Sequence, residues 1–381
     1  MKPSALNIVA DENIPALERL FGHLGTIRKL PGRTIQNSDL QQADLLLVRS
    51  VTRVDQQLLE NTPVRFVGTA TIGTDHIDTG WLEANRIGFS CAPGCNADAV
   101  AEYVISCLLL VAAEQGFSLT DKVVGIVGVG NVGRRLQQRL VDLGVKLLLN
   151  DPPRAAGGEE GFIGLSDLLA QADIVCLHTP LTRSGVHPSY HLLNAQNLHM
   201  IKPGAILLNA GRGPVIDNKA LLNWHQGRSD VTLLLDVWED EPVVDSHLAQ
   251  RVRIGTPHIA GYTLDGKIRG TWMLYRAFCQ QQGITPGIEL SDCLAHAGPA
   301  PEIVLDGSET LTNIVNAIYQ PEADFKRFMD SLVDAGSQPQ AFDLLRKNYP
   351  VRREFVAARF TGVEPAPALR QQLQAVGFKL G

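Results

Sequence analysis

Three charged residues in the middle of the chain have the types that oxidation of a 2-hydroxy acid requires. Arg212, Glu241 and His258 each follow an apolar run that reads as a strand. The reaction moves a hydride to a nicotinamide and a hydroxyl proton to a base, and histidine is the natural base near neutral pH. A carboxylate can orient the imidazole, and a guanidinium can grip a substrate carboxylate through two hydrogen bonds. The three residues therefore supply one group for each role.

Each of these residues also has a purely structural interpretation. Arg212 could form a surface ion pair, Glu241 could be a loop acid before Pro242, and His258 could cap a helix. We favour the catalytic interpretation because all three stand at predicted strand ends, where open α/β sheets bind ligands, on a segment that also carries a cofactor motif.

That cofactor motif is a glycine-rich turn between an apolar run and a helical stretch. Gly128, Gly130 and Gly133 form the pattern G-x-G-x-x-G directly after the run at 123–127. These glycines permit the tight turn, the approach of the pyrophosphate and the close packing of helix on strand. The phosphates then lie at the helix N-terminus, where free N–H groups favour anions.

An acidic residue at the end of the next predicted strand indicates which dinucleotide is bound. Asp151 follows the apolar run at 145–150 and stands 18 residues after Gly133. An acid at this place accepts hydrogen bonds from the adenosine ribose and repels the 2′-phosphate of NADP. The sequence therefore favours NAD, although the nearby Arg154 could accept a 2′-phosphate.

The composition is typical of a globular protein with more than one domain. The chain has 381 residues, 45% hydrophobic and 19% charged, with a net charge of −6. This acidic balance argues against a nucleic-acid partner, which needs a basic face. We expect no membrane span and no secretory signal, because no apolar run is long enough. The six cysteines lack metal-ligand spacing, which predicts reduced thiols, no metal site and a cytoplasmic location.

Apolar runs alternate with helical stretches, which predicts an α/β protein with parallel sheets. We expect two Rossmann-like, doubly wound domains that flank a cleft, followed by a C-terminal α+β domain. The boundaries place 1–97 and 261–285 in a flavodoxin-like substrate-binding domain, 98–260 in the NAD-binding domain, and 286–381 in the C-terminal domain. A helix that is apolar all round is expected at 98–114.

The order of the motifs resembles that of the D-isomer-specific 2-hydroxyacid dehydrogenases over residues 5–285. The family pattern contains the G-x-G-x-x-G turn, an Arg-Gly after a strand, an Asp-Val-aromatic segment that ends in Glu-Pro, and a Thr-Pro-His. The resemblance implies that Arg212, Glu241 and His258 are catalytic and that NAD is the cofactor. It implies cofactor contacts from Gly128, Gly130, Asn131, Val132, Gly133, Asp151, His178, Thr179, Pro180, Ala210, Gly211, Arg212, Asp236 and Gly261.

Longer segments are similar to one branch of this family, whose members oxidise 4-phospho-D-erythronate in the biosynthesis of pyridoxal 5′-phosphate. The segments are 11–15 (DENIP), 47–52 (LVRSVT), 66–78, 92–97, 151–154 and 258–271. This resemblance implies the product (R)-3-hydroxy-2-oxo-4-phosphooxybutanoate and substrate contacts from Ser50, Thr71 and Tyr262. It also implies a homodimer formed through the C-terminal domain.

The residues themselves offer further candidates for binding a phosphate. Arg49 and Ser50 follow an apolar run, and 69–75 is a Gly/Thr loop, although polar residues are ordinary at strand ends. The tail segment at 349–353 (YPVRR) is basic. We hypothesise that its Arg352 and Arg353 reach the substrate phosphate, with a solvated basic face as the alternative.

Three other functions fit parts of this pattern. A related enzyme, such as a 3-phosphoglycerate or glyoxylate-type dehydrogenase, would share the catalytic residues, which act on the common part of the substrates. An NAD-binding scaffold like the dehydrogenase-related corepressors could keep them too, but the chain shows no basic arm. A structural Rossmann protein with vestigial residues is opposed by the intact Arg, Glu and His set. A turnover assay distinguishes these functions.

Overall fold

The computed structural model describes residues 5–332 and 338–380. The chain forms two compact units, one made of 1–96 with 263–299 and the other of 97–262 with 300–381. The division into three domains stays a prediction, and residues from 300 onwards pack with the predicted NAD-binding part in one unit. No helix in the described ranges is both long enough and apolar enough to cross a membrane.

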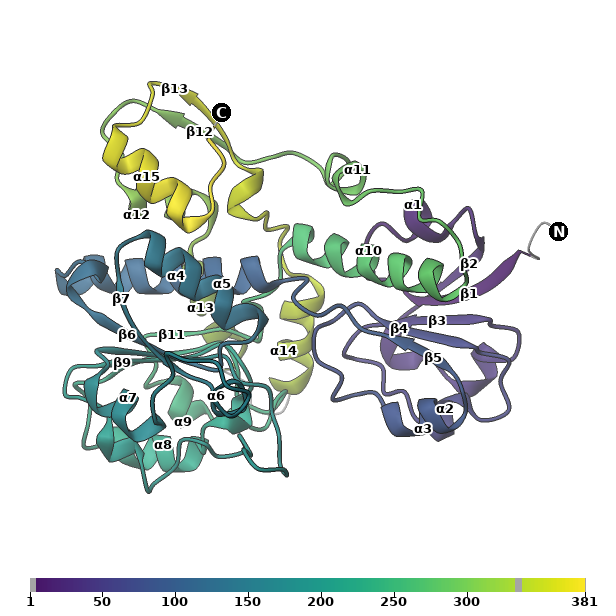
Figure 1. Ribbon diagram of the computed structural model, residues 1–381, viewed down its shortest axis with the longest axis horizontal. Helices are drawn as coiled ribbons and strands as arrows, with labels where there is room; N and C mark the ends of the chain where they lie inside the picture. The colour runs from purple at the N-terminus through teal and green to yellow at the C-terminus, as the bar shows by residue number, and fades with distance from the viewer. Residues whose placement is uncertain (1–4, 333–337, 381) are drawn as a thin grey trace. The chain divides into compact units, whose positions relative to one another are not determined.

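The first unit contains a five-stranded parallel sheet of order β2-β1-β3-β4-β5 (Figure 1), the order of flavodoxin-like folds. Its strands are β1 Leu6–Asp11, β2 Gly25–Leu30, β3 Leu45–Val48, β4 Phe66–Thr69 and β5 Gly88–Ser90. Its helices are α1 Leu17–Phe21, α2 Gln56–Leu59, α3 Thr79–Ala84, α10 Leu264–Gln281 and α11 Leu290–Leu294. β3 and β4 are buried throughout, as expected for the centre of a parallel sheet.

The second unit contains a six-stranded parallel sheet of order β11-β10-β9-β8-β6-β7. Its strands are β6 Val123–Val127, β7 Lys146–Asn150, β8 Ile174–Leu177, β9 Ile206–Asn209, β10 Thr232–Leu235 and β11 Ile254–Gly255. Its helices before residue 263 are α4 Ala97–Gln115, α5 Asn131–Asp142, α6 Pro152–Ala156, α7 Leu165–Gln171, α8 Asn218–His225 and α9 Ser246–Ala249. The strand order reverses between β6 and β8, so the predicted α/β, doubly wound class is confirmed.

The C-terminal segment adds a small parallel pair of strands and four helices to the second unit. These elements are β12 Glu302–Leu305, β13 Arg359–Gly362, α12 Leu311–Ile318, α13 Pro321–Ser331, α14 Gln338–Lys347 and α15 Pro367–Val376. α12 packs on α4, α13 on β11 and α15 on α5. The apolar helix α4 is therefore covered by the C-terminal segment as well as by the sheet, which explains why it is buried along most of its length.

A buried polar cluster also connects the C-terminal segment to α4. Glu102 on α4 lies 3.4 Å from Nη2 of Arg139, and its Oε1 accepts a hydrogen bond from the backbone N–H of Phe355 at 3.0 Å. Burial is the largest influence on the Glu102 carboxyl and raises its pKa to about 8. The charge of Arg139 opposes this shift, and the neighbouring carboxylate of Glu354 adds to it.

We expect the free energy of unfolding to fall as the pH rises towards 8. Folded Glu102 keeps its proton until about pH 8, whereas an ordinary glutamate loses it near 4.5. Between these values the folded state binds more protons, so a higher pH favours unfolding. Urea midpoints at several pH values measure this slope. Glu102→Gln should flatten it, and Glu364→Gln, which removes an exposed partner of Arg370, should leave it unchanged. A wild-type slope in Glu102→Gln would contradict the assignment.

Candidate active site

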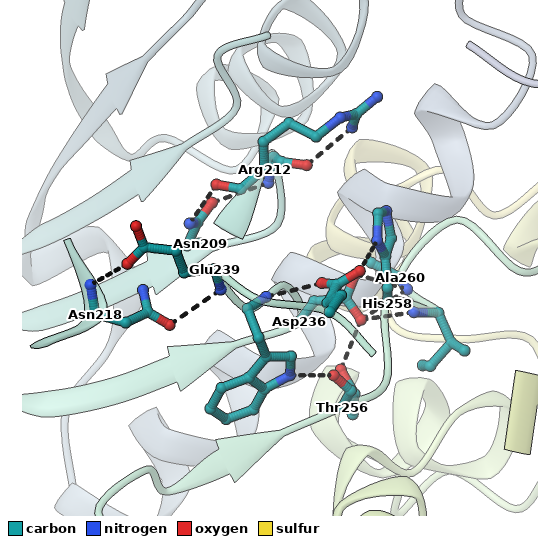
Figure 2. Close-up of polar contacts among 12 residues, drawn as sticks. Asn209, Arg212, Asn218, Asp236, Glu239, Thr256, His258 and Ala260 are labelled. Atoms are coloured by element: carbon teal, nitrogen blue, oxygen red, sulfur yellow. Dashed lines mark hydrogen bonds and ion pairs between the residues drawn. The ribbon is translucent and has the colours of Figure 1, made fainter. Parts of the chain in front are cut away.

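Three neighbouring strands of the six-stranded sheet end in the loops that hold the predicted catalytic residues. β10 lies between β9 and β11 and is parallel to both, so their carboxyl ends meet at one edge of the sheet. Arg212 follows β9, Asp236 and Glu241 follow β10, and His258 follows β11. Figure 2 shows Arg212, Asp236 and His258 on these loops.

His258 and Glu241 form a hydrogen-bonded pair. Nδ1 of His258 lies 2.8 Å from Oε2 of Glu241, whose Oε1 accepts a hydrogen bond from the N–H of Trp238 at 2.8 Å. Burial alone would raise the pKa of the Glu241 carboxyl, but the charge and hydrogen bond of His258 outweigh it and hold the pKa below its ordinary value. An ionised carboxylate only accepts, so Nδ1 carries a hydrogen and Nε2 is left for another partner.

Asp236 fixes the backbone on both sides of His258. The N–H of His258 donates to the Asp236 carbonyl at 2.7 Å, and the Asp236 carboxylate accepts from the hydroxyl of Thr256 and from the N–H groups of Ile259 and Ala260. Burial raises the pKa of this carboxyl, and these hydrogen bonds oppose the rise. His258 has a φ of 56°, a left-handed conformation that non-glycine residues rarely adopt, so these contacts hold it in place.

The loop that carries Arg212 is held against the loop after β10. The Asn209 side chain donates to the Arg212 carbonyl and accepts from the Gly211 N–H, both at 3.0 Å. A Cβ at Gly213 would lie 1.8 Å from the carbonyl oxygen of Trp238, so no other residue fits there. The predicted guanidinium and the predicted histidine pair are therefore brought to the same edge of one sheet.

The glycine turn after β6 has the geometry of a dinucleotide site. Gly128 has a φ of +86°, and a Cβ at Gly133 would lie 2.1 Å from the Gly128 carbonyl oxygen. A Cβ at Gly130 would meet nothing within 4 Å, so the turn has open space in front of it. Helix α5, with Asn131 and Val132 in its first turn, begins at this turn. The residues fit a pyrophosphate at the helix N-terminus.

Asp151 directly follows β7, the second strand of the motif. Its carboxylate accepts hydrogen bonds from the N–H groups of Val129 at 2.8 Å and Arg154 at 3.2 Å. The Arg154 guanidinium donates to the carbonyl of Val129 and pairs with Glu159. Because Arg154 is already paired with Glu159 and Asp151 is an acid, this arrangement favours NAD over NADP.

Unpartnered polar atoms lie beside the glycine turn. Both ring nitrogens of His178 and the hydroxyl of Thr179 are buried without a hydrogen-bond partner in the described part of the chain. A Cβ at Gly128 would lie 2.7 Å from the backbone nitrogen of Thr179, which places these residues at the turn. Burial lowers the pKa of His178 to about 4, so its ring is neutral. Buried polar atoms are normally paired, and a bound dinucleotide would supply partners here.

The other predicted cofactor contacts lie on the same loops. They are Pro180 after β8, Ala210 and Gly211 after β9, and Gly261 after β11.

In the first unit the predicted substrate residues follow two neighbouring strands. Arg49 and Ser50 come after β3, and Thr71 comes after β4. The hydroxyl of Thr69 lies 2.8 Å from that of Thr71 and 2.9 Å from Nε2 of His76. Sequence reasoning missed His76, which lies in the quoted segment 66–78 and is connected to Thr71 through the Thr69 hydroxyl.

The two arginines of the basic segment at 349–353 are buried, whereas the sequence suggested that they reach a substrate phosphate. Arg352 and Arg353 are 7% and 9% exposed, and Arg352 donates to the Ala260 carbonyl and lies over the Tyr319 ring, 4.5 Å from its centroid. Their burial opposes the hypothesis that they reach a substrate phosphate. Sequence reasoning also did not single out Arg346 on α14, whose guanidinium lies over the Tyr262 ring.

One group of side chains in the described residues has the spacing of metal ligands. It consists of His191, Asp217 and Glu239. Nε2 of His191 contacts Glu239, while the other carboxylate oxygens of Glu239 and Asp217 accept backbone N–H groups at 2.9 and 2.8 Å. These contacts account for the group without an ion.

Known proteins of similar fold cover about three quarters of this chain. A 3-phosphoglycerate dehydrogenase from Entamoeba histolytica, solved with NAD⁺, has a TM-score of 0.62 and 22% identity and covers 74% of this chain and 96% of its own. An Aquifex aeolicus D-lactate dehydrogenase in complex with NAD and lactic acid has a TM-score of 0.59 and 21% identity and covers 77% of this chain and 100% of its own. These likenesses establish the fold.

Sequence comparisons establish the family. Residues 111–260 match the NAD binding domain of the D-isomer specific 2-hydroxyacid dehydrogenases, and 302–377 match a domain of unknown function, DUF3410. The erythronate-4-phosphate dehydrogenase of Azotobacter vinelandii is 48% identical and covers 98% of this chain and 99% of its own. That of Pseudomonas aeruginosa strain PAO1 is 46% identical, with 99% of each chain covered. The chain therefore belongs to the erythronate-4-phosphate dehydrogenases, within the NAD-dependent, D-isomer-specific 2-hydroxyacid dehydrogenase family.

Proposed function

We propose that this protein oxidises 4-phospho-D-erythronate with NAD to (R)-3-hydroxy-2-oxo-4-phosphooxybutanoate, a step in pyridoxal 5′-phosphate biosynthesis. The observation that carries the proposal is the His258–Glu241 pair at 2.8 Å, at the sheet edge that also holds the dinucleotide turn. Relatives that are 46–48% identical over nearly the whole chain and bear this enzyme name support the choice of substrate.

The geometry suggests how the residues divide the work. Arg212 binds the substrate carboxylate, and Nε2 of His258 takes the hydroxyl proton, because Nδ1 faces Glu241. Glu241 stabilises the imidazolium that forms. NAD, when bound, supplies the nicotinamide carbon that accepts the hydride. The turn at Gly128 and the carboxylate of Asp151 would hold its pyrophosphate and ribose, and Asp236 would face the carboxamide.

In the first unit, we propose substrate contacts from Arg49, Ser50 and Thr71. Their support is their position at the ends of the neighbouring strands β3 and β4, where open α/β sheets bind ligands.

We also propose a homodimer formed through the C-terminal segment and a cytoplasmic location. The separate family match of 302–377 supports a distinct role for the segment. The six cysteines are free thiols, which fits a reducing compartment. Light scattering after gel filtration, at several concentrations of the full chain, tests the dimer. A chain that lacks 300–381 is unsuitable for this test, because the deletion would expose the apolar helix α4.

The substrate is tested by NADH formation with 4-phospho-D-erythronate, D-3-phosphoglycerate and unphosphorylated D-erythronate. We expect activity with the first compound and little with the other two. Activity with 3-phosphoglycerate alone would be consistent with the proposed catalytic residues and would contradict the proposed substrate. Because tightly bound NADH can block turnover, inactivity with all three counts against the enzyme only after a 2-oxo acid has been added to re-oxidise it.

A further inference from the structure

Helix α14 directs one face toward the loop that carries Glu241. Gln338, Phe342 and Arg346 are spaced four residues apart and lie on the same face of this helix (yellow-green in Figure 1). The Gln338 side chain accepts a buried hydrogen bond from the N–H of Val244 at 3.1 Å. Phe342 packs edge-on against Phe328, with the ring centroids 6.2 Å apart. These two contacts fix the position of Arg346.

Arg346 lies beside Tyr262, and the negative charge of Glu241 acts on its guanidinium. Its guanidinium is 5.4 Å from the centroid of the Tyr262 ring and 6.0 Å from that of Phe342. Tyr262 is held in turn by an edge-on contact with Tyr349 at 5.9 Å. Burial works against the charge of Arg346, but Tyr262 and Glu241 outweigh it, so its pKa is raised and the guanidinium stays charged.

Arg346 has hydrogen-bonding capacity that the described part of the chain does not use. Its Nε is buried and has no hydrogen-bond partner there. Arg352 also has unpartnered nitrogens, but it is 7% exposed and enclosed by the rings of Tyr319 and Tyr349. Arg346 as a residue is partly exposed, and its unpartnered Nε belongs to a charged guanidinium beside Tyr262. A charged donor that is partly exposed and incompletely paired is suited to an anion.

We propose that Arg346 is a specificity-determining residue that binds the phosphate of the substrate. This inference rests on the proposed function, which assigns Arg212 to the substrate carboxylate. It assigns no arginine of the second unit to the substrate phosphate. A planar guanidinium can bind two phosphate oxygens at once, and the Tyr262 ring restricts its orientation. Arg346 also offsets the negative charge of Glu241, which would otherwise repel a phosphate. The C-terminal segment thereby contributes to substrate choice.

Steady-state kinetics of Arg346→Gln on the full-length protein test the proposal. The KM for 4-phospho-D-erythronate should rise roughly 10- to 100-fold, the effect of losing charge-assisted hydrogen bonds, with a much smaller change in kcat. kcat/KM for unphosphorylated D-erythronate should not fall. Arg346→Lys should recover part of the loss, because a point charge binds phosphate without the bidentate geometry. Arg370→Gln, which removes a partly exposed arginine of the same segment, should leave KM and kcat for both substrates unchanged.

Equal losses of kcat on both substrates would overturn the proposal. They would make Arg346 a positioning residue that acts through Glu241, and the pH profile of kcat would then shift as well.

A binding measurement separates this inference from the proposed function. Inorganic phosphate should raise the Tm of the NAD-loaded protein above that in chloride at equal ionic strength, and Arg346→Gln should abolish the difference. If the wild type showed this effect but did not oxidise 4-phospho-D-erythronate, the proposed function would fail and the phosphate site would stand. An equal Tm increase in both proteins, or none in the wild type, would overturn the phosphate site.

Discussion

Replacement of His258 by glutamine should lower kcat for 4-phospho-D-erythronate oxidation by roughly 100- to 10,000-fold, the usual contribution of a positioned base. Glutamine keeps a polar side chain of similar reach but cannot accept the hydroxyl proton. The substitution removes the 2.8 Å contact between Nδ1 of His258 and Glu241. It leaves the hydrogen bond from the backbone N–H of residue 258 to the Asp236 carbonyl in place. The variant should therefore fold and bind NADH normally, which NADH fluorescence measures.

The contact between His258 and Glu241 leads to a second expectation, that the losses of kcat in their variants are not additive. Glu241 acts through His258, so Glu241→Gln should lower kcat on its own, whereas adding it to His258→Gln should cost little more. His247→Gln is the matched control, because that histidine is 82% exposed on the same unit. Near-normal kcat in His258→Gln, or fully additive losses in the double variant, would show that the base has been misassigned.

The sequence predicted the sheets well where apolar runs were bounded by polar residues, and it failed where local signals conflicted. β2, Gly25–Leu30, was missed because Arg28 and Lys29 interrupt its apolar residues, and the strand lies at an edge where half its positions face solvent. No helix was predicted at 152–156, where two prolines, Pro152 and Pro153, stand in succession. Proline is well suited to the first turn of a helix, and the Asp151 side chain caps this one.

The common location of the proposed catalytic residues was predictable, because ligand sites in parallel sheets lie at the carboxyl ends of the strands. Arg212, Glu241 and His258 each follow a strand by a few residues, so local sequence places them. Arg346 has no such signal, because only the packing of α14 on the loop after β10 brings it to Tyr262. Arg352 illustrates the opposite error: its basic neighbourhood suggested a surface, and tertiary packing buried it.

Replacement of Arg212 by glutamine should lower kcat/KM by roughly 100- to 10,000-fold, since a bidentate pair loses two charge-assisted hydrogen bonds of about 1.5–3 kcal/mol each. The loop itself should survive the change. Its shape depends on the Asn209 side chain and on the close approach of Gly213 to Trp238, and the Arg212 guanidinium is needed for neither contact. Arg212→Lys should be intermediate, because it keeps the charge and loses the fork geometry.

The division of the lost activity between KM and kcat distinguishes the role of Arg212 from that of His258. A residue that binds the carboxylate in both the ground state and the transition state raises KM, whereas a base affects kcat alone. Binding of the 2-oxo product to the enzyme–NADH complex, followed by NADH fluorescence, should therefore weaken in Arg212→Gln and persist in His258→Gln. Arg251→Gln, an exposed arginine of the same unit, should bind as the wild type does. If Arg212→Gln bound the 2-oxo acid normally, the carboxylate must be held by another group, and Arg346, which lies over the Tyr262 ring, would be the first to examine.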